Sequence, residues 1–284
     1  MSEIILEGVS YSYGKKTPYE ILALNNVSVK IPRGKITGII GHTGSGKSTL
    51  VQMLNGLIKP DSGRVLIDGE DIWQKPKEIT KYRFKVGLVM QYPEYQLFEE
   101  TVGEDIAFGP KNMGLDESEI AERVREAAEF VGLAPDMLEK SPFDLSGGQK
   151  RRAAIAGIIA MRPDVLVLDE PAAGLDPKGR ESIFENISEY KNKTGRTVVI
   201  VSHSMEDMAR YCDELIVLSG ARVLMMGTPK KVFSEPEILV TNGLDIPAIA
   251  RLNMLLREKG IELGEGIYTV DDAFERIINF KKES

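Results

Sequence analysis

A glycine-rich loop between an apolar run and a helical stretch constrains this chain more than any other feature. It reads Gly41-His42-Thr43-Gly44-Ser45-Gly46-Lys47-Ser48-Thr49 and fits the pattern G-x-x-x-x-G-K-[ST]. Residues 36–40 before it are typical of a buried strand, and a helix is expected over 47–56. In this context backbone N–H groups point at phosphate oxygens, Lys47 adds a cation, and Ser48 supplies a hydroxyl for Mg²⁺. The sequence therefore predicts a phosphate-binding loop.

Composition narrows the class of protein. The 284 residues carry a net charge of −7 and are 42% hydrophobic, which is enough for a real core and argues against nucleic acid as the main partner. The single cysteine, Cys212, cannot form an intramolecular disulfide. The N-terminal residues 1–7 do not resemble a signal peptide, and runs such as 165–168 are far shorter than the roughly 18 residues that span a bilayer. Any membrane role is therefore expected to come through a partner.

Short β-branched runs alternate with helical patterns along the chain, which predicts an α/β fold. Strands are expected near 3–9, 27–31, 36–40, 64–68, 86–90, 165–168, 197–201, 214–218 and 222–226. Runs 36–40, 165–168 and 197–201 lack alternation, as in a parallel sheet buried on both faces. Strands 3–9 and 64–68, beside turns at Asp61-Ser62-Gly63 and Asp68-Gly69, favour a small antiparallel subdomain.

Two helical regions complete the expected organisation. A helical subdomain, about 92–160, is inserted into a domain spanning 1–228, with a helix over 116–131 that buries Val124, Ala128 and Val131. Residues 229–284 form a mostly helical C-terminal appendage, a candidate for dimerisation. Its helices are expected at 230–234, 235–242, 245–257 and 271–280, with Ile249, Leu252 and Leu256 on one stripe.

Two carboxylates follow the apolar run at 165–168. Asp169, at a strand end beside a phosphate loop, can orient Mg²⁺, usually through water. Glu170 leaves in another direction and can reach the water that attacks the γ-phosphate. An acidic pair alone would suggest a helix cap, but the loop at 41–49 favours the catalytic interpretation.

Ser146-Gly147-Gly148-Gln149 opens another helix and forms a second candidate anion site. Taken alone, Ser-Gly-Gly is an ordinary N-cap. If both helix ends serve nucleotide, either the chain folds them onto one phosphate or two chains share the work.

The ordered set of motifs resembles the ATP-binding-cassette ATPases over about 1–228. It comprises Gly41–Thr49, Gln91, Leu145–Gln149, Leu166–Glu170, Ala173–Asp176 and His203. The resemblance implies a P-loop NTPase core, ATP and Mg²⁺, and two cassettes paired head to tail, with ATP between one chain's phosphate loop and the other's Ser146 segment.

The same resemblance assigns further roles by position. Tyr13 corresponds to the aromatic that stacks on adenine, and Gln91 to the residue that links Mg²⁺ and the attacking water to the transporter contact. Asp176 lies in the loop that crosses the dimer interface, and His203 contacts the γ-phosphate. The alternatives are strand packing for Tyr13 and helix capping for His203. Ala172 and Ala173 stand where Ser or Thr is common in the family, which puts a minor polar contact in doubt.

A narrower resemblance covers 91–98, 101–110, Leu244–Pro247 and Leu255–Gly260. These stretches are similar to the ATPase subunits of energy-coupling factor transporters, which import vitamins and, in relatives, cobalt or nickel. His42 is similar to one of the two ATPase types of such modules, or is a variable position pointing away from phosphate.

The function expected is an ATPase that powers import of a micronutrient from the cytoplasmic face of the membrane. Its partners would be a second cassette, identical or not, a transmembrane coupling protein and a substrate-binding membrane protein, without nucleic acid. The alternatives are a soluble non-transport cassette, an ATPase of another transporter class, or a scaffold that does not hydrolyse. The intact Glu170 and His203 disfavour a scaffold, and the absence of a basic tail disfavours a nucleic-acid cassette.

Overall fold

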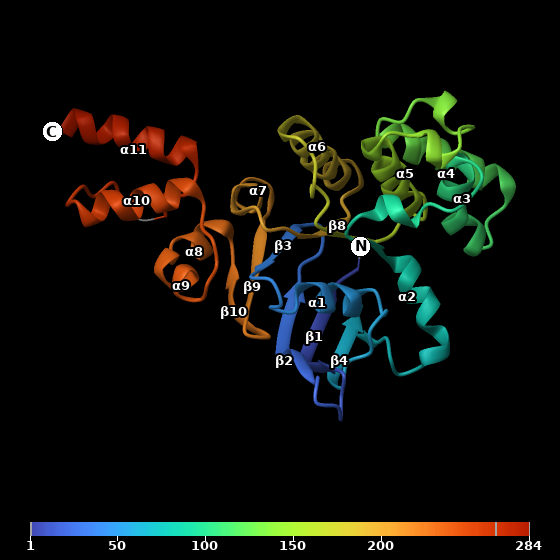
Figure 1. The fold of residues 1–284 in the computed structure, drawn as a ribbon, viewed down its shortest axis with the longest axis horizontal. Coiled ribbons are helices and arrows are strands. Elements are labelled where there is room, and N and C mark those ends of the chain that lie inside the picture. The colour runs from blue at the N-terminus through green and yellow to red at the C-terminus, as the bar shows by residue number, and fades with distance from the viewer. Residues whose placement is uncertain (1, 265, 284) are drawn as a thin grey trace.

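Two sheets organise the computed structural model, which describes residues 2–264 and 266–283 (Figure 1). The larger has the order β10-β9-β3-β8-β7-β6, parallel except for β10. The smaller is antiparallel, with the order β2-β1-β4-β5. The strands are β1 (Ile4–Tyr13), β2 (Ile21–Ile31), β3 (Ile36–Gly41), β4 (Ser62–Ile67), β5 (Glu70–Asp71), β6 (Val86–Val89), β7 (Val165–Asp169), β8 (Thr197–Val201), β9 (Glu214–Ser219) and β10 (Arg222–Gly227).

The helices lie around and beyond these sheets. They are α1 (Lys47–Leu54), α2 (Ile79–Lys85), α3 (Val102–Asn112), α4 (Glu117–Phe130), α5 (Gly147–Ala160), α6 (Pro177–Thr194), α7 (Met205–Tyr211), α8 (Pro229–Phe233), α9 (Pro236–Thr241), α10 (Ala248–Glu258) and α11 (Val270–Glu283). Within the described part of the chain, no helix is both long and apolar enough to cross a membrane.

The large sheet separates two hydrophobic cores, because successive side chains of a strand point to opposite faces. On β3, Ile40 joins the core beneath the helical subdomain and α6, whereas Ile39 joins the core shared with α1 and the small sheet. Burial on both faces explains why β3, β7 and β8 show no polar alternation in sequence. This confirms the predicted α/β class.

Several predicted boundaries were wrong. Ser62 and Gly63 belong to β4 and not to a turn; Gly63 has φ +83°, and a Cβ there would approach Gly8 O to 2.5 Å. Helix α1 ends at Leu54, and α10 begins at Ala248, after Pro247 at its N-cap, because a proline disfavours helical geometry in the residue before it. The short strand β5 and helix α2 were not foreseen.

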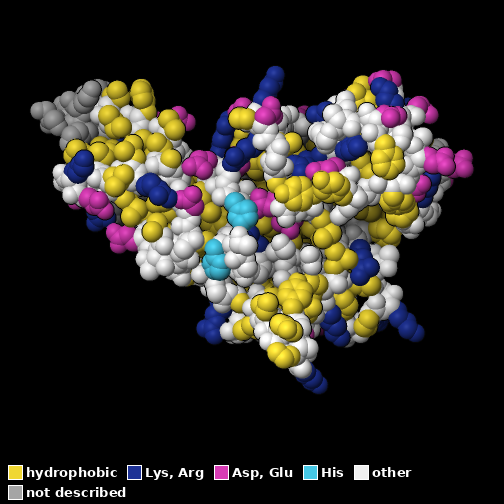
Figure 2. Space-filling view, in the orientation of Figure 1, with side chains coloured by type: hydrophobic (Ala, Val, Ile, Leu, Met, Phe, Trp, Pro, Cys, Tyr) yellow, Lys and Arg dark blue, Asp and Glu magenta, His cyan; other side chains and the backbone are white. Residues whose placement is uncertain are grey.

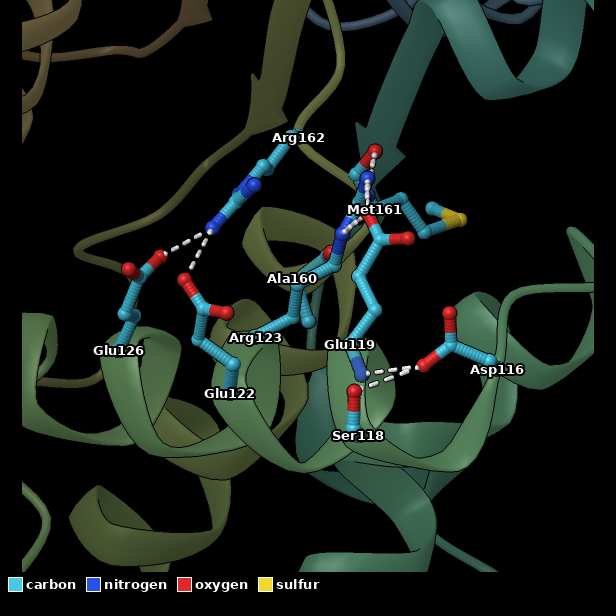
Figure 3. Close-up of polar contacts among 9 residues, drawn as sticks. All are labelled: Asp116, Ser118, Glu119, Glu122, Arg123, Glu126, Ala160, Met161 and Arg162. Atoms are coloured by element: carbon cyan, nitrogen blue, oxygen red, sulfur yellow. Dashed lines mark hydrogen bonds and ion pairs between the residues drawn. The ribbon is translucent and has the colours of Figure 1, made fainter.

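Within the helical subdomain, two arginines hold α4 against the C-terminal end of α5. Arg123 of α4 donates from Nη1 to the carbonyls of Ala160 and Met161, at 3.4 and 3.3 Å, and its Nη2 lies 2.6 Å from a Glu119 carboxylate oxygen (Figure 3). Beside it, Arg162 pairs with Glu126 at 2.6 Å. Cationic groups at a helix C-terminus satisfy its free carbonyls and its dipole. As predicted, no strand interrupts the described residues from Gln91 to Ser146.

The first part of the appendage packs on the main core. Val232, Phe233, Leu239 and Ile246 are buried in the same cluster as the helical subdomain. A separate small cluster holds α10 against α11, through Leu263, Ile267 and Ala273 with Ile249 and Leu256. Leu252, predicted on the same stripe, is instead 41% exposed.

Candidate functional site

The loop from Gly41 to Thr49 leaves the N-terminus of α1 open. Its N-cap, Gly46, has φ 102°, and no side chain caps the helix. A Cβ on Gly46 would lie 2.3 Å from the Ala23 carbonyl oxygen, and one on Gly41 would lie 2.5 Å from that of Leu218. Both glycines are therefore required by the chain's own packing, and the uncapped amides remain available to an anion.

Lys47 closes over this loop. Its Nζ donates to the carbonyls of Gly41 at 2.7 Å and His42 at 3.0 Å, and the residue is only 7% exposed. Burial lowers the pKa of Lys47, while the carboxylates of Glu170 and Asp169 act in the opposite sense. A triphosphate would supply the negative charge that this buried ammonium lacks.

Parallel register brings the strand-end residues to the phosphate loop. Strands β3, β8 and β7 are adjacent, and Asp169 pairs with Val201. Burial raises the pKa of Asp169, opposed by a hydrogen bond from the Ser48 hydroxyl and by the charge of Lys47. Ser48 and Asp169, both predicted on Mg²⁺, are thus in contact.

Glu170 and His203 face each other across the ends of β7 and β8. Glu170 Oε1 lies 3.1 Å from His203 Nε2, and the Glu170 side chain is 12% exposed. Burial, reinforced by the negative charge of Asp169, raises the pKa of Glu170 to about 7. Burial and then the charge of Lys47 lower the pKa of His203. The pair therefore holds a carboxyl group that titrates near neutrality beside a neutral imidazole, which suits proton transfer.

The backbone at Glu170 is in the left-handed region, with φ 52°. Two hydrogen bonds hold it there: Glu170 N–H donates to Val201 O at 3.0 Å, and Ala173 N–H donates to Glu170 O at 3.1 Å. A non-glycine residue in this conformation persists only where its surroundings impose it. The turn after β7 is thus built to direct this one side chain.

Gln91 follows β6 at the same edge of the sheet. Val89 lies beside Leu168 in register, so Gln91 and Glu170 each stand two residues beyond a paired position. Gln91 is exposed. The sheet therefore carries it to the level of the strand-end carboxylates.

Ser146 to Gln149 form a second helix end with different chemistry. Gln149 N–H donates to Ser146 Oγ at 3.3 Å and Ser146 N–H donates to Gln149 Oε1 at 2.9 Å, a reciprocal capping box. Among the described residues no hydrogen bond joins this end to the 41–49 loop, and Figure 1 shows α5 and α1 in separate parts of the molecule. The structure thus does not fold both helix ends onto one phosphate.

Asp176 caps a helix of its own chain. It is the N-cap of α6, and its Oδ1 accepts from Gly179 N–H at 2.8 Å. His203 does not cap the helix that follows it, because the N-cap of α7 is Ser204.

Tyr13 and His42 flank the loop. The Tyr13 hydroxyl lies 3.1 Å from Thr49 Oγ1. The residue is 42% exposed, and its ring packs edge-on against Tyr11 at 4.9 Å between centroids. His42 is turned toward the β9–β10 hairpin: its Nδ1 lies 2.8 Å from Thr43 O, and Nε2 lies 3.5 Å from Gly220 N. Figure 2 shows both histidines of the chain on one face.

Sequence reasoning missed the buried Arg151, which reaches Glu94 and the turn after Glu170. In the sequence Arg151 is the middle one of three consecutive basic residues, Lys150-Arg151-Arg152, and nothing in that run distinguishes it from its neighbours. Its position one helical turn after the Ser146 cap, toward the buried face of α5, is the signal that could have singled it out.

The donor set of the site fits Mg²⁺. Ser48 offers a hydroxyl, Asp169 a carboxylate and Gln91 an amide oxygen, all hard oxygen ligands. Within the described ranges no group of three or more His, Cys, Asp or Glu side chains could hold a metal ion by itself. A magnesium ion here would depend on the phosphates of a nucleotide, as is usual for this cation.

Comparisons with known proteins agree with this geometry. Residues 24–173 match the family model described as ABC transporter. The chain is 51% identical over 277 residues to the energy-coupling factor transporter ATP-binding protein EcfA2 of Caldanaerobacter subterraneus subsp. tengcongensis, covering 98% of this chain and 97% of the relative. It is 50% identical to EcfA2 of Clostridium perfringens, covering 97% of each.

Solved structures show the same similarity. CbiO1 of Clostridium perfringens, described as part of the ABC transporter complex cbiONQ, matches with a TM-score of 0.74 and 41% identity over 88% of this chain and 97% of that one. The ATP-binding cassette MJ0796, solved as a post-hydrolysis dimer bound to ADP and Pi, matches with a TM-score of 0.72 and 31% identity over 80% and 98%.

Proposed function

Because this chain belongs to the energy-coupling factor ATP-binding proteins of the ABC transporter family, we propose that it hydrolyses ATP to drive membrane import of a micronutrient, a vitamin or a transition-metal ion. The Glu170–His203 pair, at 3.1 Å beside the phosphate loop, is the observation that carries the chemistry. The family supplies the coupling to transport.

The proposed roles combine the contacts described above with the roles that the family resemblance assigns. Lys47 and the amides of 41–49 hold the phosphates, and Tyr13 stacks on adenine. Glu170 accepts the proton of the attacking water, and His203 steadies the γ-phosphate. Mg²⁺ would be held by Ser48, Asp169 and Gln91, where it supplies positive charge to the phosphate oxygens.

We propose that a second cassette completes the site. The Ser146 end lies apart from this chain's own loop, so it is free to face the loop of a partner, with Asp176 at the interface between them. The comparison cassette that was solved as a dimer with ADP and Pi supports this pairing. Residues 229–284 would add to it, since apolar side chains gather over α10 and α11 (Figure 2), among them Leu255, Val270 and Phe274.

The membrane partner would dock near Gln91. Exposed aromatic side chains concentrate in this region, at Tyr92, Tyr95, Phe98 and Phe108, as interfaces favour. We propose a transmembrane coupling protein on this surface, with the substrate carried by a further membrane protein. In this proposal the chain works at the cytoplasmic face of the membrane. Identification of the membrane proteins that co-purify with it tests the assignment, and their absence under conditions of active import would contradict it.

Replacement of Glu170 by Gln tests the chemistry. The amide is nearly isosteric with the carboxylate but cannot accept a proton, so ATP turnover should fall by roughly 100- to 10,000-fold while nucleotide binding persists. Glu189→Gln is the matched control, since Glu189 is exposed and pairs with Lys193 on the surface of α6. Near-normal turnover in Glu170→Gln would remove Glu170 from the role.

A further inference from the structure

Arg151 ties together three segments that surround the candidate site. It lies on α5 and is 3% exposed. Its Nε and Nη2 donate to the two carboxylate oxygens of Glu94, at 3.1 and 3.0 Å. Its Nη1 donates to the carbonyls of Pro171, at 3.4 Å, and Ala173. One planar guanidinium is thus shared between a carboxylate and two backbone carbonyls.

The partners of Arg151 lie next to residues with proposed roles in hydrolysis. Glu94 lies in the single turn Pro93–Gln96, three residues after Gln91. Pro171 and Ala173 belong to the turn that directs Glu170, and Ala173 N–H itself donates to the Glu170 carbonyl. Arg151 therefore connects the segment after Gln91 to the backbone that presents the water-activating carboxylate.

A buried ion pair is weak evidence for a stabilising role, because apolar residues of similar volume often stabilise as well or better. What apolar residues cannot reproduce is the geometry: a bidentate fork on Glu94 with the remaining nitrogen on two carbonyls of a strained turn. Just beyond the opposite end of α5 the arrangement contrasts, because Arg162 pairs there with the exposed carboxylates of Glu122 and Glu126 (Figure 3).

We propose that Arg151 is a positioning residue for hydrolysis, which fixes the turn 171–173, and through it Glu170, according to the placement of Glu94. The inference rests on the proposed role of Glu170 as the group that accepts the water's proton. A shift of the 93–96 segment would thereby change the alignment of the carboxylate, so a partner docked near Gln91 acts on turnover through this arginine.

Arg151→Lys tests the idea, because it keeps the charge and loses the planar fork. Measured in the chain's ATP-hydrolysing assembly, we expect kcat to fall roughly 10- to 100-fold while KM and nucleotide affinity stay within about twofold. Glu94→Gln should give the same split, and the double variant should be no worse than the more damaged single variant, since both act through one contact. Arg162→Lys, at the other end of the same helix, should leave kcat unchanged.

A second pair of substitutions separates positioning from folding. Arg151→Met with Glu94→Leu replaces the ion pair by apolar volume, so the melting temperature should recover relative to Arg151→Met alone while kcat stays low. Recovery of kcat together with stability would overturn the proposal, as would unchanged kcat in folded Arg151→Lys. If Glu170→Gln retains turnover, the proposed role of Glu170 fails; if Glu170→Gln is inactive and Arg151→Lys is not, only the role of Arg151 fails.

Discussion

The two helix ends predicted to bind anions differ in what their glycines are for. At α1, Gly46 has φ 102° and a Cβ would collide with a neighbouring strand. At α5, Gly147 and Gly148 have no such constraint: a Cβ on either would meet nothing within 4 Å. The chain's own packing therefore requires glycine at the first end and not at the second.

The side chains at the two ends differ in the same sense. Lys47 is buried, and the start of α1 has no side-chain cap. Ser146 is exposed and has its own capping box with Gln149. The first end is a site prepared within one chain, and the second is a surface whose lack of side-chain bulk suits the close approach of another molecule. This difference between the two ends is the strongest structural support for a shared site.

The largest expected effect is a difference in ATP affinity between variants at the two helix ends. Lys47→Ala should weaken ATP affinity by roughly 1.5–3 kcal/mol, the contribution of a charge-assisted hydrogen bond. Ser146→Arg should leave affinity at the chain's own loop unchanged, because that loop is untouched, and abolish ATPase by steric bulk at the partner's site. Calorimetry with a steady-state ATPase assay distinguishes the two variants.

Mixing these two variants shows which chains pair. In a homodimer both lesions can fall in one composite site and leave the other intact, so the mixture should regain ATPase that neither variant shows alone. In an obligate heterodimer, recovery would require the second ATPase type. A light-scattering mass measured with ATP distinguishes these arrangements, and an active monomer under all conditions would contradict the shared site.

The surroundings of the two helix ends also differ in how buried ionisable groups affect the free energy of folding. Near α1, burial raises the pKa of Glu170 to about 7, so the folded state binds its proton more tightly than the unfolded state. Stability from this group is present below about pH 4.5 and is lost as the pH rises to about 7. Near the capped end of α5 the buried charge of Arg151 is instead neutralised by its ion pair with Glu94.

Glu170→Gln should therefore stabilise the protein in a pH-dependent way. Without Mg²⁺ and nucleotide, we expect a gain of roughly 1–3 kcal/mol at pH 8 and little change near pH 5. Urea unfolding at the two pH values measures it, with Glu189→Gln as the control. A gain independent of pH would mean that Glu170 does not titrate as its burial implies.

Sequence patterns predicted the parts of the site that are local. The loop 41–49 and the strand-end pair Asp169-Glu170 are contiguous motifs, and buried runs such as 197–201 identify sheet strands without tertiary information. The contact of Arg151 with Glu94 spans 57 residues, and nothing in either local pattern specifies it. The same holds for Phe233, whose place in the main core depends on how the appendage docks.

The smallest expected effect is a gain of stability at the second helix end. Gly148 has ordinary helical geometry and open space where the methyl group of an alanine would lie, so Gly148→Ala should stabilise the isolated chain by roughly 0.5–1 kcal/mol through reduced backbone entropy of the unfolded state. ATP affinity of its own loop should not change, whereas ATPase of the assembled pair should fall at least about tenfold, because the methyl group occupies the space that the partner's nucleotide needs. Gly46→Ala is the counterpart, expected to lose both stability and nucleotide binding. Thermal unfolding, calorimetry and ATPase together check the pair, and full ATPase in Gly148→Ala would show that no ligand closely approaches this end of α5.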